Sequence, residues 1–187
     1  PKADICKTFS NRNTGKLVRV GRVMCYAAKV EGYAPSARRM RWRNFTELHA
    51  VGRDVEKLYN IIMASLPKYA KVVRIHSSGD FYCREYFMAW VKVAAQFPEI
   101  TFFAYTKVLD YARYNHGVSN LFIQYSYGSQ DDRRYRKLAK IKRPPTCFIG
   151  ESKNQYPETK IVCGSGDTDH EDYLAILRRE NFVIRIH

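Results

Sequence analysis

Small and charged side chains follow a predicted buried strand in the segment RIHSSGDFYC, residues 74–83. The next predicted strand ends in Tyr105, Thr106 and Lys107, and the third ends near Ser126. The carboxyl ends of parallel strands meet at one edge of a sheet, where α/β proteins place their functional groups. We therefore expect a composite site at this edge. The catalytic candidates are Asp80, Lys107, Ser126 and His76, and the cofactor-binding candidates are Ser78, Gly79 and Tyr105.

The role of Asp80 has two interpretations. An acidic side chain just before a predicted helix can cap the N–H groups of its first turn. A carboxylate that faces Lys107 from the neighbouring strand can instead pair with that lysine or with the ammonium group of a ligand, which Gly79 would let approach closely. The segments SSGD (77–80) and GSGD (164–167) look like phosphate-binding loops. They fit neither the Walker spacing nor the G-x-G-x-x-G fingerprint, which argues against an NTPase.

The charge of the chain is strongly positive. Lys and Arg number 32 against 18 acidic residues, a formal net charge of +14. Such a charge attracts polyanions, most often nucleic acid, although an acidic protein would also fit and solubility alone is the plain alternative. Basic and aromatic residues alternate over 37–45 and 131–143, which suits phosphate contact with base stacking and also a solvated helix face. The nucleic-acid candidates are Arg38, Arg39, Arg41, Arg43, Arg133, Arg134, Arg136 and Lys137.

The elements that would position these residues alternate between helix and strand. We predict helices over 44–66, 83–97 and 108–116, one from about 131, and one after a capping box of Thr168 and Glu171. Strands are predicted over 71–76, 100–107 and 120–129, within 157–166 and over 181–187. This alternation predicts the α/β class with a mainly parallel sheet. The sheet would be partial and TIM-barrel-like with helices outside, or open and doubly wound.

The length of 187 residues suits a single domain. We expect an irregular N-terminal segment over 1–43, packed on an α/β domain over 44–187. No apolar run is long enough to span a bilayer, and the first residues lack the apolar core of a secretory signal. These features predict a cytoplasmic protein that has no membrane partner.

The chain has five cysteines, none in a C-x-x-C pair. An odd number argues against a disulfide framework. Cysteines of an intracellular chain are core residues, metal ligands or catalytic groups. Cys83 lies on the apolar face of a predicted helix and is expected to be a packed thiol.

Several segments resemble one family, the gene product 88 family of bacteriophage proteins: CYAAKVEGY (25–33), RNF (43–45), VRIHSSGDFYCREYFMAW (73–90), FFAYTK (102–107) and the terminal VIRIH. The resemblance covers most of the chain, and its most specific part is the pair R-I-H-x-S-G-D-F and Y-T-K. That family in turn resembles radical S-adenosylmethionine proteins. In those, cysteines around a CYA motif hold a [4Fe–4S] cluster, and a strand-end motif at the place of SGDF grips the cofactor.

The resemblance implies a metal site formed by Cys6, Cys25, Cys147 and Cys163, which can hold an iron–sulfur cluster or zinc. The sequence departs from the radical enzymes, because Cys25 has no second cysteine near it. A cluster with four thiolate ligands also leaves no open iron for S-adenosylmethionine. The alternative is that all these cysteines are ordinary core residues.

Three functions stay open. The first is a phage protein of the host cytoplasm with a strand-end site, a cysteine-ligated metal centre and a basic surface for nucleic acid or a host nucleoprotein. The second is an enzyme that binds S-adenosylmethionine at an iron–sulfur cluster. The third is a non-catalytic host-takeover protein that binds an acidic host protein.

Overall fold

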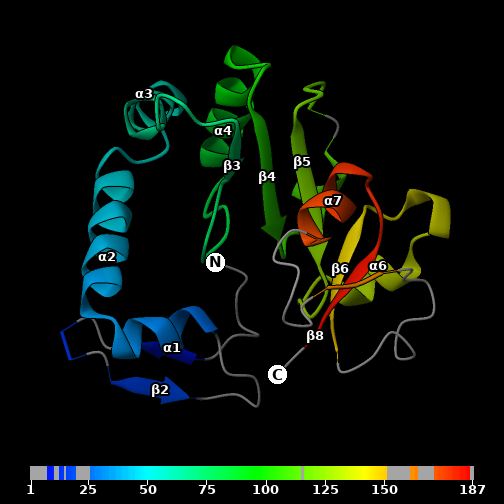
Figure 1. Cartoon of the computed structure of the whole chain (residues 1–187), viewed down its shortest axis with the longest axis horizontal. Helices are drawn as coiled ribbons and strands as arrows, with labels where there is room; N and C mark the ends of the chain where they lie inside the picture. Colours follow the sequence, from blue (N-terminus) through cyan, green and yellow to red (C-terminus); the bar gives the residue numbers. More distant parts are fainter. Residues whose placement is uncertain are drawn as a thin grey trace.

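A six-stranded parallel sheet forms the centre of the computed structural model, which describes residues 8–10, 13–14, 16–19, 26–114, 116–150, 161–163 and 171–185 (Figure 1). The strand order is β3-β4-β5-β6-β8-β7, and every neighbouring pair is parallel. The strands are β3 (Val72–Arg74), β4 (Thr101–Thr106), β5 (Leu121–Ser126), β6 (Thr146–Gly150), β7 (Ile161–Cys163) and β8 (Phe182–Arg185).

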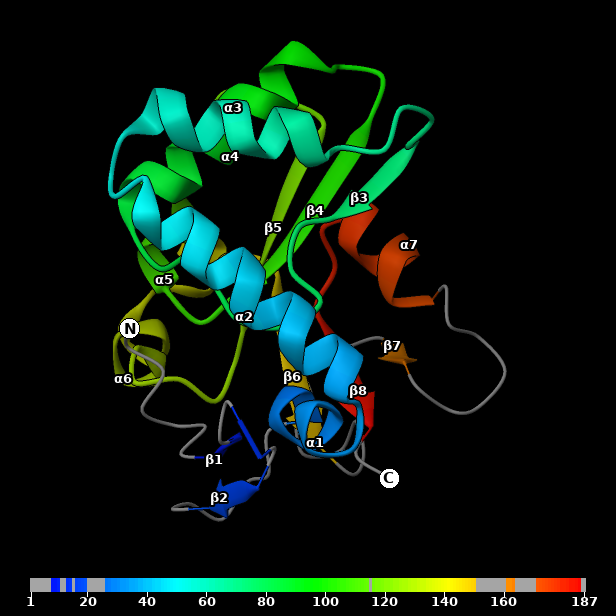
Figure 2. The ribbon, with the colours of Figure 1, turned by 90° about the vertical axis from the view of Figure 1, so that its left-hand side faces the viewer.

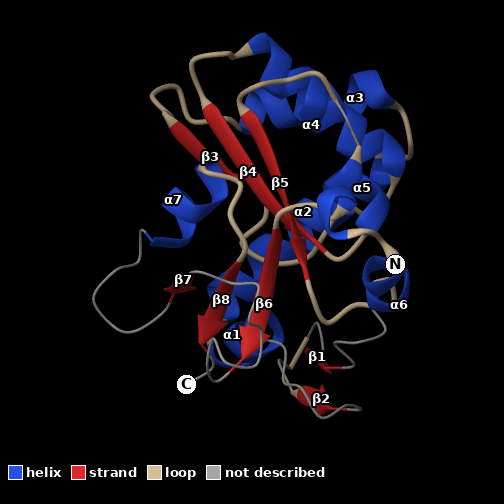
Figure 3. Ribbon diagram, turned by 90° about the vertical axis from the view of Figure 1, so that its right-hand side faces the viewer, coloured by secondary structure: helices blue, strands red, loops and turns tan. Residues whose placement is uncertain are grey.

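Helices connect successive strands. They are α4 (Arg84–Gln96) after β3, α5 (Leu109–Arg113) after β4, α6 (Asp132–Lys137) with the 3₁₀ helix η1 (Lys140–Lys142) after β5, and α7 (Glu171–Leu177) after β7. The chain moves one way along the sheet from β3 to β6, and moves back from the edge strand β7 to β8. Because parallel crossovers are right-handed, this reversal places α7 on the opposite face from α4, α5 and α6 (Figure 3).

The N-terminal part corrects the prediction of an irregular segment over 1–43. Its described residues form an antiparallel hairpin and two helices: β1 (Thr8–Ser10), β2 (Leu17–Arg19), α1 (Tyr26–Tyr33) and α2 (Pro35–Ala50). Figure 2 shows α2 running from α1 to α3 (Val55–Ser65) along one side of the molecule. The division into a segment and a domain stays a prediction.

The single helix predicted over 44–66 is wrong, because α2 and α3 share this stretch. Gly52 lies in the turn between them with a φ of +68°, a conformation that other residues rarely adopt. The Asp54 carboxylate then accepts hydrogen bonds from the N–H groups of Glu56 (3.0 Å) and Lys57 (3.1 Å), which caps α3.

Both faces of the sheet carry a core. On one face, Phe87 of α4 and Leu58 of α3 belong to a cluster with Phe102 of β4. On the other face, Phe103 of β4 packs with Ile176 of α7. Since alternate residues of a strand point to opposite faces, β4 serves both cores and is apolar along most of its length.

The α/β class with a mainly parallel sheet is confirmed, and the sheet is open. The predicted strands over 71–76, 100–107 and 120–129 correspond to β3, β4 and β5, and the helix over 83–97 corresponds to α4. β6 is a strand that the sequence analysis does not predict. Thr168 lies outside the described residues. Across the described part of the chain, no helix combines the length and apolar character needed to cross a bilayer.

Candidate functional site

Asp80 ties the loop after β3 to the end of β4. Its Oδ1 accepts hydrogen bonds from the Phe81 N–H (2.7 Å) and the Thr106 hydroxyl (2.8 Å), and its Oδ2 accepts one from the Lys107 N–H (2.7 Å). Burial raises the pKa of the Asp80 carboxyl, although these hydrogen bonds and the Lys107 charge act in the opposite direction. Both oxygens are therefore engaged by the protein, and the carboxylate fastens two neighbouring strand ends.

The interpretation of Asp80 as the cap of α4 is wrong. The N-cap is Cys83, whose Sγ accepts a hydrogen bond from the Tyr86 N–H at 3.4 Å. Cys83 is buried in the core cluster of α4, which confirms the prediction of a packed thiol. Burial also raises the pKa of this thiol.

Lys107 reaches from the end of β4 to the end of β5. Its ammonium donates to the Ser126 hydroxyl (3.3 Å) and to the carbonyls of Tyr127 (3.4 Å) and Gly128 (3.3 Å). All three acceptors are neutral, and none of the ion pairs among the described residues includes Lys107. The structure therefore brings Asp80, Lys107 and Ser126 to one edge, but Asp80 contacts the Lys107 backbone and not its ammonium.

His76 lies under this edge against aromatic rings. Its ring centroid is 4.8 Å from that of Phe81 and 5.7 Å from that of Tyr86. Burial, and to a smaller extent the charge of Arg74, lowers the pKa of His76 to about 4. The imidazole is therefore neutral near pH 7, and its contacts are those of a packed aromatic group.

The three cofactor-binding candidates have different surroundings. Ser78 is half-buried, and Gly79 is exposed with a φ of +87°, which strains any other residue there. Tyr105 points to the opposite face from Thr106, where its ring lies 6.3 Å from that of Phe182. The structure therefore does not bring Tyr105 together with the Asp80 carboxylate.

The described residues place one thiol of the predicted metal site, that of Cys147. This side chain is 1% exposed and packs with Phe103, Ile176 and Phe182, as the alternative of an ordinary core residue predicts, and its role as a metal ligand stays a prediction. No group of three or more metal-ligating residues occurs within the described ranges. Cys6, Cys25 and the side chain of Cys163 lie outside them.

Two of the nucleic-acid candidates, Arg38 and Arg41, form contacts within the protein. Arg38 is buried and donates to the Glu31 carbonyl at 2.6 Å. Arg41 donates to the Ala27 carbonyl at 2.9 Å and pairs with the Glu31 carboxylate at 3.3 Å. These contacts hold α2 against α1, so both arginines lack the exposure that contact with nucleic acid requires. Arg39 and Arg43 are exposed.

The second basic cluster lies on α6 and η1. Arg134 pairs with Asp110 at 2.8 Å and with Asp131 at 3.3 Å. The other cations of α6 and η1 are exposed, and they form no ion pair with an acidic side chain in the part of the chain that the structure describes. We name them the α6–η1 surface: Arg133, Arg136, Lys137, Lys140 and Lys142.

The sequence analysis does not predict a cavity of about 500 Å³ at the amino-terminal ends of β5 and β6, away from the strand-end edge that holds Asp80. The basic residues in its lining are Arg113, His116 and Arg179. A second cavity of about 250 Å³ shares Arg179 with the first and adds Lys140 and Arg143. These residues come from separate segments of the chain, and no local pattern in the sequence connects them.

The fold defines an open, mainly parallel α/β protein with a polar strand-end edge. A family model described as Gene product 88 matches residues 1–183, and the chain belongs to this family of bacteriophage proteins, which confirms the resemblance. No solved structure matches the chain.

Two curated relatives are each described as a Gene 88 protein. The Gene 88 protein of Mycobacterium phage D29 is 32% identical over 153 residues, which cover 75% of this chain and 63% of that protein. The Gene 88 protein of Mycobacterium phage L5 is 30% identical over 112 residues, which cover 55% of this chain and 47% of that protein. The chain thus spans less than two thirds of the length of either relative.

Proposed function

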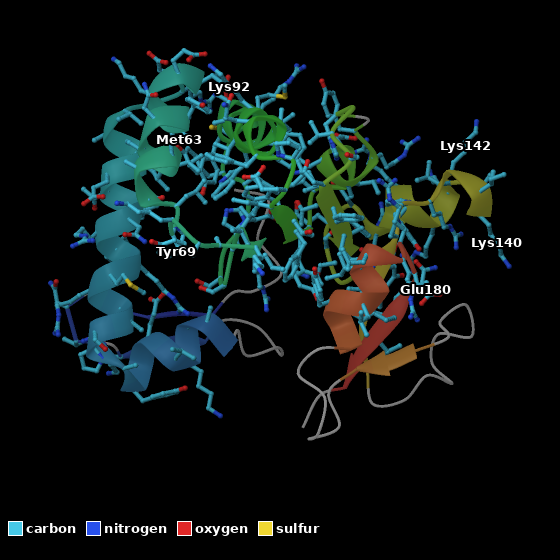
Figure 4. All side chains as sticks on the ribbon, turned by 45° about the horizontal axis from the view of Figure 1, so that its top comes forward. Met63, Tyr69, Lys92, Lys140, Lys142 and Glu180 are labelled. Atoms are coloured by element: carbon cyan, nitrogen blue, oxygen red, sulfur yellow. The ribbon has the colours of Figure 1, made fainter. Side chains whose placement is uncertain are left out.

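We propose that this protein binds nucleic acid through the α6–η1 surface. The observation that carries the proposal is the row of exposed cations on consecutive turns, with no acidic residue between Arg133 and Arg143. Figure 4 shows Lys140 and Lys142 at the outer end of this row, pointing away from the sheet. Ile141 between them is 93% exposed, so it offers an apolar contact to a base. The net charge of +14 adds long-range attraction to a polyanion.

Binding of this kind depends on salt. Each phosphate contact contributes about 0.7–0.9 to the slope of log affinity against log salt, because counterions are released. Changing Arg133, Arg136 and Lys137 together to Gln should therefore reduce the slope by up to about 2–3 and weaken binding at low salt. Preference among sequences should be weak, because the chain carries no recognition motif.

The matched control is a triple change to Gln of exposed cations elsewhere, at Lys68, Lys71 and Arg84. It removes the same charge from another part of the surface, so a smaller effect on the slope supports a defined contact area. Equal effects of the two triple variants would contradict the assignment to α6–η1. Failure of the wild type to bind DNA or RNA at low salt would leave an acidic host protein as the partner.

A second candidate function is the binding of a small ligand at the strand-end edge. The observation in its favour is the Lys107 ammonium, which has three neutral oxygen acceptors and would gain a stronger, charge-assisted bond from a ligand carboxylate. S-adenosylmethionine, which the resemblance implies, carries such a carboxylate. Calorimetric titration should show heat with the wild type and none with Lys107→Gln. No heat from the wild type would exclude this ligand.

A further inference from the structure

The sheet is split between β5 and β6. In the described residues, Tyr125 pairs with Thr146 and Ser126 with Cys147, and β6 does not accompany the first part of β5. The Tyr125 N–H points toward β6 and donates to the Pro145 carbonyl at 2.9 Å. Backbone N–H and C=O groups point to alternate sides along a strand, so the groups of Ile123 point to the same side of β5 as those of Tyr125. They therefore face the split, where they can bond to a ligand.

The larger cavity lies at this split and is lined from both layers of helices. Arg113 and Tyr114 come from α5 and its end, and Ile176 comes from α7 on the other face of the sheet. Arg179, just after α7, lines this cavity and the smaller one. The two cavities are therefore neighbours, and we name them together the groove, whose smaller part is lined by Lys140 of the α6–η1 surface.

The lining of this groove is basic. It contains Arg113, Lys140, Arg143 and Arg179, and among the described lining residues there is no Asp or Glu. The pKa of His116 in the same lining is lowered by burial and by the charge of Arg179. A groove with one sign of charge concentrates the field and attracts a ligand of the opposite sign.

Arg179 occupies a backbone position that favours glycine. Its φ is +55°, and it ends α7 in a Schellman motif in which the Arg179 N–H donates to the Ile176 carbonyl and the Glu180 N–H donates to the Ala175 carbonyl, both at 2.9 Å. A side chain in this conformation is strained relative to glycine. The guanidinium lies 5.7 Å from the Phe122 ring centroid, inside the groove lining. Arg179 thus places a positive charge in the groove, at a position where the backbone conformation favours glycine.

We infer that the groove binds a single strand of nucleic acid, with its phosphates on Arg113, Arg179 and Lys140 and its bases against Tyr114 and the Arg179 plane. Single strands can present unstacked bases to aromatic rings and to Arg guanidinium planes, whereas a duplex keeps its bases paired. Two adjoining cavities of about 500 and 250 Å³ fit a chain of linked nucleotides better than one compact mononucleotide. This inference rests on the proposed function and adds to it the site and the class of nucleic acid.

The test compares two neighbouring arginines. A labelled single-stranded oligonucleotide, as DNA and as RNA, and a duplex of the same sequence are titrated at one salt concentration. Arg179→Gln should weaken single-strand binding about tenfold, the effect of losing one stacked and charged contact. Arg178→Gln removes the same charge one position away, outside the lining, and should change affinity by less than about twofold.

Arg179→Gly separates binding from folding. It should weaken binding as much as Arg179→Gln does, while the melting temperature stays equal to that of the wild type or rises, because glycine relieves the positive φ. A loss of binding that accompanies a lower melting temperature in both Arg179 variants would overturn the inference.

The outcomes also separate the inference from the proposed function. If the wild type binds no nucleic acid, both fail. If the wild type binds, the α6 triple variant binds weakly and Arg179→Gln equals Arg178→Gln, the proposed function stands and the groove inference falls. Equal binding of duplex and single strand, or displacement by an equimolar mononucleotide, would also overturn it.

Discussion

The Oδ2 atom of Asp80 accepts a hydrogen bond from the Lys107 N–H at 2.7 Å, so the loop after β3 is fastened to the end of β4 by one carboxylate. Thr106 and Phe81 donate to the other oxygen. Three donors converge on Asp80, and this arrangement makes the carboxylate a structural element of the strand-end edge.

Asp80→Asn should destabilise the protein. The asparagine keeps one acceptor oxygen and turns its NH₂ group toward an N–H, so a half-buried donor faces another donor. We expect the free energy of unfolding to fall by about 1–3 kcal/mol, measured by denaturant titration. Glu99→Gln is the control, since this acid is exposed before β4 and its loss changes the net charge equally. Equal midpoints for the two variants would show that the hydrogen bond from the Lys107 N–H contributes nothing to stability.

His76 should make stability depend on pH. Its pKa is about 4 in the folded protein and close to the ordinary histidine value of 6.5 in the unfolded chain, so the unfolded chain binds the proton more tightly between these two pH values. The stability that neutral His76 contributes is present above pH 6.5 and is lost as the pH falls toward 4, with a slope of at most about 1.4 kcal/mol per pH unit.

The comparison for this prediction is His76→Phe, which keeps an aromatic ring against Phe81 and Tyr86 and removes the titration. The raised pKa of Asp80 acts in the opposite direction, but it is common to both proteins and largely cancels in the difference. Unfolding titrations at several pH values should give a flatter curve for His76→Phe. Parallel curves would contradict the assignment.

Asp54 should contribute a helix cap. Asp54→Ala removes the acceptor for the N–H groups of Glu56 and Lys57 and should lower stability by about 0.5–2 kcal/mol. Asp54→Asn keeps the acceptor and should restore most of the loss. If Ala and Asn behave alike in thermal melts, the start of α3 does not depend on this side chain.

Cys147→Ala tests the predicted metal site. Since the thiol is enclosed by Phe103, Ile176 and Phe182, its loss should lower stability by about 1 kcal/mol and leave the metal content of anaerobically purified protein unchanged. The iron and zinc contents of Cys147→Ala are compared with those of the wild type and of Cys6→Ala. A drop in bound metal in Cys147→Ala would place this cysteine among the ligands after all.

The parts of the fold that depend on apolar periodicity are predictable from the sequence. The alternation in FFAYT and the helical spacing around Phe87 identify β4 and α4, because each element must turn its apolar residues toward a core. The first half of α2 cannot be predicted from apolar periodicity. Its buried position is Arg38, whose side chain is satisfied by the Glu31 carbonyl, so the helix lacks the apolar stripe that would mark it.

The candidate site shows the same limit. The placement of Asp80 and Lys107 at one edge follows from the parallel order of strands, and the structure brings them together. Which atoms meet does not follow, because it depends on the direction of each side chain at the strand end. The groove around Arg179 is harder to predict from the sequence. It depends on the positive φ of Arg179 and on the first part of β5, which does not pair with β6.

The short pairing of β5 with β6 divides the sheet into two mechanical units. β3, β4 and β5 share one continuous ladder, and β6, β8 and β7 share another, while two residue pairs join the ladders among the described residues. Local opening follows such weak seams, because few hydrogen bonds must break at once. Amide hydrogen exchange should therefore resolve two cooperative blocks, with the amides of Tyr125 and Tyr127 at the seam exchanging before those of Phe102 and Phe103.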